Sequence, residues 1–380
     1  MFFRHHIYRS EDVYLLVGDE VIVTQAGKST HGLDRVFASL YGKPVPGLAF
    51  FTLSLVSTPQ RRSFPLRVEP VVRSDAEKAA SKATAASKQA KALGTPRRPG
   101  RPKGSKNTTK ADGTSTPELV RMSGWLAALL HLIAGVVSLT YVVLDGHCGH
   151  HNAWQMAQQQ HLHLISKLRC DAALSFPDTG PYAGRGPHRK YGDKVDYDAI
   201  PLPSLKAPTV EGQVKTCLSQ RQLLHKEFPQ PLHVVIIVQT NLRTQARAHV
   251  VLFSRDLALA SAPLIDYDGL RFHSEVNFRD ATQSWGMEDF MNITPTGVTN
   301  AAHLSLFMGN VAYHLRADSH PRDPASSVLD LKADCRGSTY VEETIKLLPE
   351  KPEPIVLAKI RNQVAGLGRI HIAQPSFSFS

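Results

Sequence analysis

The sequence contains few cysteines, and its first residues do not form an apolar run. Four cysteines occur in 380 residues, and their spacing does not repeat, which excludes a disulfide framework as the basis of the fold. Basic and imidazole side chains interrupt residues 4–9, so the N-terminal region does not resemble a secretory signal. A hydrophobic content of 42% is sufficient for a substantial core. We therefore expect a cytoplasmic protein with one large domain or two modest ones.

Excess positive charge is absent from most of the chain. The formal net charge is +11, and residues 61–110 hold fourteen Lys and Arg residues against three acids. The remainder has 30 basic and 30 acidic groups and is neutral. A charge excess confined to one segment is typical of an arm that binds a polyanion, and in a cell this is usually nucleic acid. A solvated linker remains the alternative.

Large apolar side chains are almost missing from residues 74–116, which we therefore expect to remain unordered. Within them, the sequence RRPGRPKGSK at residues 97–106 resembles an AT-hook, a short arm that binds the minor groove of A·T-rich DNA. The candidate DNA-binding residues in this arm are Arg97, Arg98, Gly100, Arg101, Pro102 and Lys103. A chance run of basic residues in a linker would look similar.

Apolar and β-branched residues predict two strands near the N-terminus, at residues 13–23 and 47–56, with a connection at 42–47. An uncharged run follows at residues 125–144 and reaches the length of a membrane span. Its second half is β-branched and Gly135 offers a break, so we favour a buried helix at 125–134 followed by a strand at 136–144. A membrane anchor is the alternative.

Both helices and strands are predicted in the second half of the chain. We expect a helix near residues 153–160, a strand at 161–169, and a hairpin of strands 232–238 and 248–253. The loop at 180–192, with Arg185, Arg189 and Lys190, is a candidate phosphate contact or an ordinary surface loop. Helices are then predicted around Arg271 and Glu275 and at 299–315, with short candidates at 341–348 and 355–364.

Three segments carry a family resemblance. Residues 16–20 (LVGDE), 141–146 (YVVLDG) and 271–280 (RFHSEVNFRD) resemble the DDE transposases of bacterial insertion sequences. The likeness extends from about residue 13 to residue 315. It implies an α/β fold: an RNase H-like mixed sheet flanked by helices and interrupted by a β-rich insertion. The resemblance also implies that Asp19, Asp145 and Glu275 are catalytic and bind two Mg²⁺ ions, for which Mn²⁺ can substitute.

Such a trio suits phosphodiester chemistry, because two hard cations held by carboxylates can serve both the attacking and the leaving oxygen. Asp171 also follows a predicted strand and is the rival second aspartate. Other motifs are weaker. Gly27, Lys28 and Ser29 lack the earlier glycine of a phosphate-binding loop, and the His147–His151 region is too compressed for a recognised zinc site.

The glutamate helix of the family usually reads Tyr, two residues, Arg, three residues, Glu, six residues, Lys. This sequence keeps Arg271 as a DNA contact but has Asp268 and Thr282 at the Tyr and Lys positions. Tyr267 and Arg279 are candidate substitutes that would bind DNA. Relatives generally carry an additional N-terminal DNA-binding region, whereas only 18 residues precede Asp19 in this sequence. These departures lead to the hypothesis of a shortened or impaired copy.

The organisation expected from the resemblance has six parts. They are the first part of the core (1–60), a basic linker (61–118), the second part of the core (119–170), the β-rich insertion (171–255), the glutamate-bearing and closing helices (256–316) and a C-terminal tail (317–380).

The expected function is DNA transposition, through metal-dependent cleavage and transfer of strands at insertion-sequence ends. The expected partner is double-stranded DNA, both the element ends and the target, with a homodimer on paired ends, association with the nucleoid and no membrane. A DNA-binding protein derived from a transposase, without catalysis, is the first alternative. A protein anchored in a membrane through residues 125–144 is the second.

Overall fold

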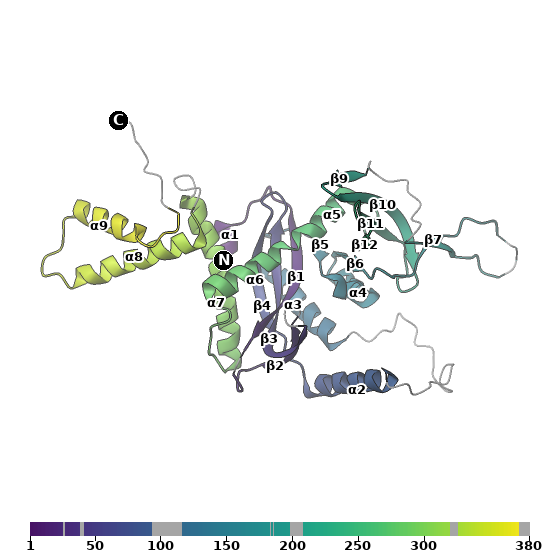
Figure 1. Cartoon of the computed structure of the whole chain (residues 1–380), viewed down its shortest axis with the longest axis horizontal. Coiled ribbons are helices and arrows are strands. Elements are labelled where there is room, and N and C mark those ends of the chain that lie inside the picture. The colour runs from purple at the N-terminus through teal and green to yellow at the C-terminus, as the bar shows by residue number, and fades with distance from the viewer. Residues whose placement is uncertain are drawn as a thin grey trace. The chain divides into compact units, whose positions relative to one another are not determined.

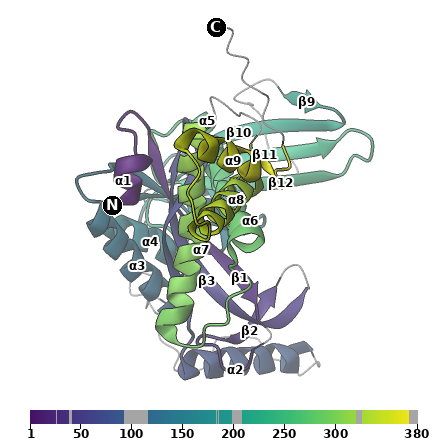
Figure 2. The same ribbon diagram turned by 90° about the vertical axis from the view of Figure 1, so that its left-hand side faces the viewer.

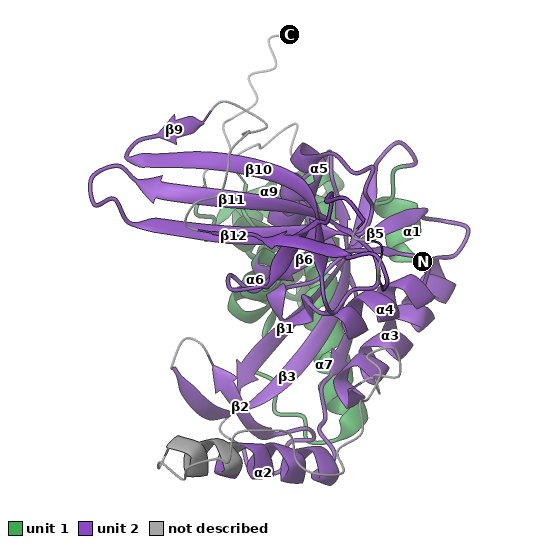
Figure 3. Cartoon of the chain, turned by 90° about the vertical axis from the view of Figure 1, so that its right-hand side faces the viewer, with its two compact units in different colours: residues 1–9, 276–380 green, residues 10–275 purple. Residues whose placement is uncertain are grey.

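The computed structural model describes most of the chain, and the described residues divide into two compact units (Figure 3). The larger unit consists of residues 10–275, and the other of residues 1–9 and 276–380. The described residues are 1–25, 27–38, 42–92, 116–182, 184, 186–197, 208–319 and 326–371.

Strands dominate the unit of residues 10–275. The strands are β1 (Tyr14–Thr24), β2 (Asp34–Ala38), β3 (Lys43–Ser57), β4 (Arg62–Pro70), β5 (Leu139–Val143), β6 (His163–Leu168), β7 (Leu174–Pro177), β8 (Tyr191–Lys194), β9 (Thr209–Glu211), β10 (Val214–His225), β11 (Leu232–Asn241) and β12 (Arg247–Ser254). The helices of this unit are α2 (Asp75–Ala92), α3 (Pro117–Ile133), the 3₁₀ turn η2 (Gly146–Cys148), α4 (His151–Gln159) and α5 (Ser261–Leu270). Helix α6 (His273–Trp285) begins in this unit and continues into the other.

The described strands form one twelve-stranded mixed sheet (Figure 1). Its central order is β3-β1-β5-β6, with β4 beside β3. Strands β1 and β3 are antiparallel, as are β3 and β4, whereas β1, β5 and β6 are parallel neighbours. This is the mixed sheet expected of an RNase H-like fold. The parallel pairs require helical crossovers, and α3 and α4 supply them.

The two faces of the central sheet are covered by different helices. Leu15 and Val17 of β1 point to a buried cluster that includes Leu264 and Leu270 at α5. The opposite face meets α3, where Phe51 of β3 stacks on Trp125 with ring centroids 5.7 Å apart. Because successive side chains of a strand alternate between faces, Asp19 belongs to the α5 face and its neighbour Glu20 to the α3 face.

The segment between β6 and α5 is rich in strands, as predicted, and extends the core sheet. Strand β12 pairs antiparallel with β6, and β11 and β10 follow in order, as the long strands in Figure 3 show. The predicted hairpin of β11 and β12 is confirmed, with register from His233 opposite Ser254 to Thr240 opposite Arg247. Strand β10 was not predicted, because its apolar and polar residues do not alternate cleanly.

The uncharged run at residues 125–144 is divided between a helix and a strand, as favoured. Helix α3 ends at Ile133, Gly135 adopts a φ of +74° that suits glycine, and β5 begins at Leu139. The membrane alternative is wrong in the described part of the chain, where no helix is long and apolar enough to cross a bilayer. The start of α3 was missed. It lies at Pro117, where Thr116 caps the helix by accepting a hydrogen bond from the Leu119 amide at 3.3 Å.

Three other predicted boundaries differ from the structure. Residues 43–47, expected as a connection, belong to β3 and pair with β2. The linker predicted at 61–118 contains β4, whose pairing with β3 orders it, and α2, whose alanines favour helix. Residues 93–115, with the AT-hook-like motif, lie outside the described residues. The single helix expected around Arg271 is divided into α5 and α6, with Arg271 in the turn between them.

The other unit is helical. It contains α1 (Phe2–His6), the larger part of α6, α7 (Pro295–Ser319), α8 (Val328–Lys346) and α9 (Pro354–Gly366). Phe2 of α1 contacts Phe307 of α7 with ring centroids 5.2 Å apart. Helices α8 and α9 lie side by side (Figure 2), and Gly337 permits this because an added Cβ would approach the Ala365 Cα to 2.7 Å. The predicted short helices at 341–348 and 355–364 are thus parts of longer ones.

Candidate active site

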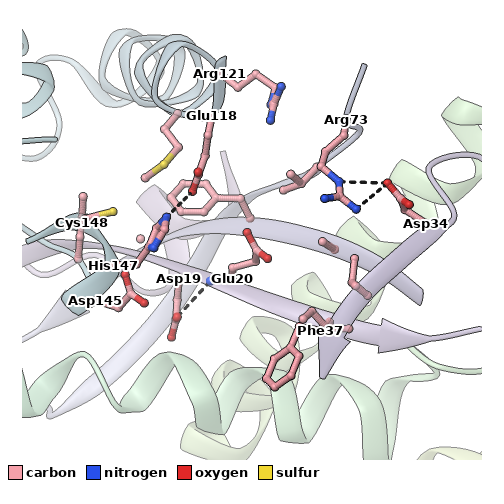
Figure 4. Close-up of a pocket in the computed structure, with 18 of the residues that line it drawn as sticks. Asp19, Glu20, Asp34, Phe37, Arg73, Glu118, Arg121, Asp145, His147 and Cys148 are labelled. Atoms are coloured by element: carbon pink, nitrogen blue, oxygen red, sulfur yellow. Dashed lines mark hydrogen bonds and ion pairs between the residues drawn. The ribbon is translucent and has the colours of Figure 1, made fainter. Parts of the chain in front are cut away.

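A cavity of about 470 Å³ lies beside the end of β1 in the unit of residues 10–275. Its walls come from β1, β2 and β3, from helices α2 and α3, and from the turn after β5. Figure 4 shows acidic side chains gathered at one end, including Asp19, Glu20 and Asp145, and the ion pair of Arg73 with Asp34 at the other. Both aspartates predicted as catalytic therefore line the same cavity.

Asp19 and Asp145 are brought together by the register of the two parallel strands that precede them. Val17 of β1 lies opposite Val143 of β5, and each aspartate follows two residues later. The β1 strand continues through Asp19 because β3 pairs with it on the other side, where Thr52 lies opposite. The Thr52 hydroxyl donates a hydrogen bond to the Asp19 carbonyl at 3.2 Å. The register thus places Asp19 next to the turn that follows β5 and carries Asp145.

The Asp19 carboxylate is largely buried, with 12% of its side chain exposed, and has several donors around it. Oδ2 accepts hydrogen bonds from the Ser274 hydroxyl at 2.5 Å and from Nη1 of Arg271 at 3.0 Å. Oδ1 accepts one from the Glu20 amide at 3.0 Å. Burial raises the pKa of Asp19, and the contacts with Ser274 and Arg271 counteract only part of that effect.

Glu275 reaches the site through Arg271. The Nη2 atom of Arg271 lies 3.5 Å from Oε1 of Glu275, while Nη1 contacts Asp19. One guanidinium therefore bridges the first predicted catalytic acid and the third. Arg271 is 15% exposed and Glu275 is 48% exposed. The close approach depends on the break between α5 and α6, where the Arg271 and Phe272 amides donate to carbonyls three residues earlier.

The turn after β5 presents Asp145 to solvent at the cavity. The Ser166 hydroxyl of β6 donates to the Asp145 carbonyl at 2.6 Å and holds the backbone of this turn. Gly149 then passes so close to β6 that an added Cβ would lie 1.9 Å from the Lys167 carbonyl oxygen. Only glycine fits at that close approach. The turn therefore contacts β6 at both of its ends, through the hydrogen bond at Asp145 and the close approach of Gly149.

Glu20 and Glu118, also at the acidic end, were not proposed as functional residues from the sequence, and His147 was considered there only as a possible zinc ligand. His147 lies 3.3 Å from Glu118 through Nε2, and Glu20 of β1 lies beside this pair (Figure 4). The surrounding protein atoms and the Glu118 carboxylate raise the pKa of Glu20. The helix-start sequence Thr116-Pro117-Glu118 was the available signal for Glu118, because an acid in the first turn favours a helix N-terminus.

A family comparison adds to this geometry. A model described as DDE superfamily endonuclease matches residues 4–226, which is more than half of the chain. The chain belongs to this family. Asp19 and Asp145 lie within the matched residues, and Glu275 lies beyond them. No curated protein shows a significant match to the chain. The family confirms the expected DDE relationship and implies a nuclease-type activity on DNA.

Endonucleases of this superfamily generally use divalent metal ions, and the donor chemistry here suits them. Carboxylate oxygens are the ligands that Mg²⁺ prefers. In the described residues, however, no three His, Cys, Asp or Glu side chains converge closely enough to hold an ion. A cation does stand between two of the predicted ligands, because the Arg271 guanidinium bridges Asp19 and Glu275. The space between these two acids therefore accommodates a positively charged group.

The predicted DNA contacts occupy varied positions. Arg271 is engaged with the acids, and the Tyr267 ring packs on Tyr141 with centroids 5.6 Å apart. Arg189 donates to the carbonyl of Tyr191, whereas Lys190 donates to that of Pro229 in the turn between β10 and β11. Arg279, in the other unit, is exposed and lies 3.5 Å from Asp280. Arg185 and the candidates at 97–103 lie outside the described residues.

Two acids that complicated the sequence interpretation have basic partners. Asp268, expected to repel a phosphate, lies 3.2 Å from Nζ of Lys167 on β6. Asp171, the rival second aspartate, is exposed and pairs with Arg169 at 2.9 and 3.1 Å, and it does not line the cavity that contains Asp19.

The zinc alternative also lacks support, since burial raises the pKa of the Cys148 thiol to about 12 and the His150 Nδ1 accepts a hydrogen bond from Ala153.

Proposed function

We propose that the chain is a transposase that cleaves DNA at the ends of a mobile element and joins the strands to a target, with Asp19, Asp145 and Glu275 as its acidic residues. One observation carries the proposal. In a chain of the DDE superfamily endonuclease family, Asp19 of β1 and Asp145, in the turn after the parallel neighbour β5, line one cavity. Glu275 is linked to Asp19 through Arg271.

The three carboxylates would hold two Mg²⁺ ions, for which Mn²⁺ can substitute. Bound divalent ions supply an activated water or 3′-hydroxyl and stabilise the leaving oxygen of an in-line displacement. The residues of the chain position these partners. Asp145 reaches them from the exposed turn, Asp19 from the sheet and Glu275 from α6. Because the pKa of Asp19 is raised, its carboxylate becomes protonated at a higher pH than an ordinary aspartate. As the pH is lowered, we therefore expect cation binding to be lost earlier than at a site built from ordinary aspartates.

DNA engagement beyond the acids is part of the same proposal. The excess positive charge of residues 61–110 would bind the backbone of the element ends and the target, with the AT-hook-like residues in a minor groove. The strands between β6 and α5 would act as the insertion of the family and lie against the same duplex. We further propose that two copies act on paired ends, in association with the nucleoid.

The test is metal-dependent cleavage of a labelled duplex that carries the element ends. We expect Asp19→Asn, Asp145→Asn and Glu275→Gln each to lower cleavage in Mg²⁺ or Mn²⁺ by at least about a thousandfold while DNA binding remains. Asp171→Asn is the matched control, because it removes an exposed carboxylate outside the cavity, and we expect it to cleave like the parent chain. Retained cleavage in all three acid variants would refute the assignment.

A DNA-binding protein without catalysis is the second candidate. The supporting observation is that Asp19 and Glu275 are both engaged by Arg271, with no three-residue metal group among the described residues. The same assay separates the candidates. A parent chain that binds the duplex tightly and never nicks it, in either metal, would favour this second function over the first.

A further inference from the structure

The acid centre of this structure contains its own counter-ion. Nη1 of Arg271 lies 3.0 Å from Oδ2 of Asp19, and Nη2 lies 3.5 Å from Oε1 of Glu275. Arg271 and Asp19 are largely buried, so solvent screens their attraction less than it would at an exposed surface. The guanidinium thus provides a single positive charge where the proposed function requires divalent ions.

Asp19 is also occupied by hydrogen bonds. A carboxylate has about four lone-pair sites, and three donors already use those of Asp19: Arg271, Ser274 and the Glu20 amide. Two of these donors, Arg271 and Ser274, bind the same oxygen, Oδ2. The other Nη atom of Arg271 contacts Glu275. A divalent ion that binds both acids must therefore displace Arg271, because the two positive charges repel each other at this separation.

Arg271 has unused capacity for another anion. Its Nε has no hydrogen-bond partner among the described residues, and because this atom is buried, a phosphate can reach it only when the guanidinium turns away from the two carboxylates that its Nη atoms contact. A phosphate diester matches the planar Nε–Nη edge of a guanidinium with two parallel hydrogen bonds, which neither Asp19 nor Glu275 provides here. A DNA phosphate is thus a better-matched partner for Arg271 than either acid taken singly.

We propose that Arg271 is a positioning residue that suppresses cation binding by Asp19 and Glu275 until a DNA phosphate takes over its guanidinium. This inference rests on the proposed function, and it adds a coupling between DNA binding and cation binding at the same acids. In the absence of DNA, the Arg271 guanidinium pairs with the two acids, and the Ser274 hydroxyl holds Asp19 by a hydrogen bond. When the phosphate engages Arg271, both carboxylates become available. Coupling of this kind is reciprocal, so bound cation must also strengthen DNA binding.

The test measures Mn²⁺ binding to the full chain by electron paramagnetic resonance, without reference to cleavage. In the absence of DNA, Arg271→Gln removes the competing charge, and we expect it to bind Mn²⁺ about tenfold more tightly than the parent chain. Arg169→Gln is the matched control. It removes an exposed guanidinium that pairs with Asp171, and we expect parent affinity.

A short duplex supplies the second arm, with the Mn²⁺ bound by DNA alone subtracted. It should raise the affinity of the parent chain and leave that of Arg271→Gln nearly unchanged. A merely structural role of Arg271 would not produce this difference. Should Arg271→Gln fail to fold, Ser274→Ala removes the second tie on Asp19, and we expect it to give a smaller increase of the same sign.

Unchanged or weaker Mn²⁺ binding by the folded Arg271→Gln chain would overturn the inference, as would an equal effect of DNA on both chains. The failure of the proposed function looks different. In that case the parent chain never cleaves DNA, although Arg271→Gln still gains Mn²⁺ affinity and loses it again when Asp19→Asn is added. The two measurements therefore separate the coupling from the catalysis.

Discussion

The C-terminal helices depend on one buried carboxylate, and its removal gives a sharp prediction. Asp330, in the first turn of α8, is completely buried. Its Oδ1 accepts from the Ile370 and His371 amides at 2.6 and 3.1 Å. Its Oδ2 accepts from the Ser327 amide at 2.8 Å and the Ser327 hydroxyl at 2.7 Å, and lies 2.8 Å from Nδ1 of His371. This carboxylate joins the start of α8 to the segment after α9.

We expect Asp330→Asn to lower the free energy that keeps residues 370–371 attached to α8 by about 3 kcal/mol. The amide keeps one acceptor and turns an NH₂ group toward existing donors, and each buried donor left without a partner costs about 1–3 kcal/mol. Loss of the negative charge weakens the remaining bonds further. Since 1.4 kcal/mol corresponds to about a factor of ten, protection of the Ile370 and His371 amides should fall about a hundredfold.

Hydrogen exchange at pH 7, followed by mass spectrometry of a peptide that covers residues 367–371, measures this effect directly. Glu343→Gln is the control. It neutralises an exposed acid on the same helix that pairs with Lys346, and we expect little change. Equal protection of Ile370 in Asp330→Asn and in the parent chain would show that the buried carboxylate does not hold the segment.

The same residue predicts a pH dependence. Burial alone would raise the pKa of Asp330, but the hydrogen bonds from His371 and Ser327 outweigh it and lower the pKa. A carboxyl with a lowered folded pKa contributes stability above its unfolded pKa of about 3.9, and loses it as the pH falls toward the folded value. The difference in urea midpoint between Asp330→Asn and the parent chain should therefore narrow as the pH falls below about 4. A difference that stays constant down to pH 3 would contradict this explanation.

Three further substitutions test the packing around the site, each by thermal unfolding of the full chain. Gly149→Ala forces a Cβ against the Lys167 carbonyl and should cost about 1–3 kcal/mol; an unchanged midpoint would mean that the turn after β5 is not fastened as described. Tyr141→Phe removes a hydroxyl that donates to Asp256 at 2.6 Å, with an expected loss of about 1–2 kcal/mol. Because burial raises the pKa of Tyr141, that loss should persist up to the unfolded pKa of about 10 and decline only above it, and an earlier decline would argue against it. Lys167→Ala leaves Asp268 without its partner and should cost about 1 kcal/mol, whereas Lys167→Ala combined with Asp268→Ala should recover part of the loss.

Local patterns were sufficient to predict the strands that present the first two acids. The apolar, β-branched residues around Leu16 and Val142 indicate buried strands independently of the rest of the chain, because a strand can be recognised from the pattern of neighbouring residues. The position of Asp19 in β1 and of Asp145 two residues after β5 followed from the same runs. The break at Gly135 was also visible, since glycine tolerates the positive φ found there.

Contacts between residues far apart in sequence could be decided only by the tertiary structure. No local pattern shows that Arg271, between α5 and α6, would face Asp19 of β1, or that Lys167 would neutralise Asp268. The division of one expected helix into α5 and α6 has the same origin, because packing of Leu270 in the core sets the direction of the chain before His273. The sequence by itself thus determined which strands carry the acids, through short-range periodicity. Only the fold decided which charges those acids meet, since a through-space contact depends on the path of the whole chain.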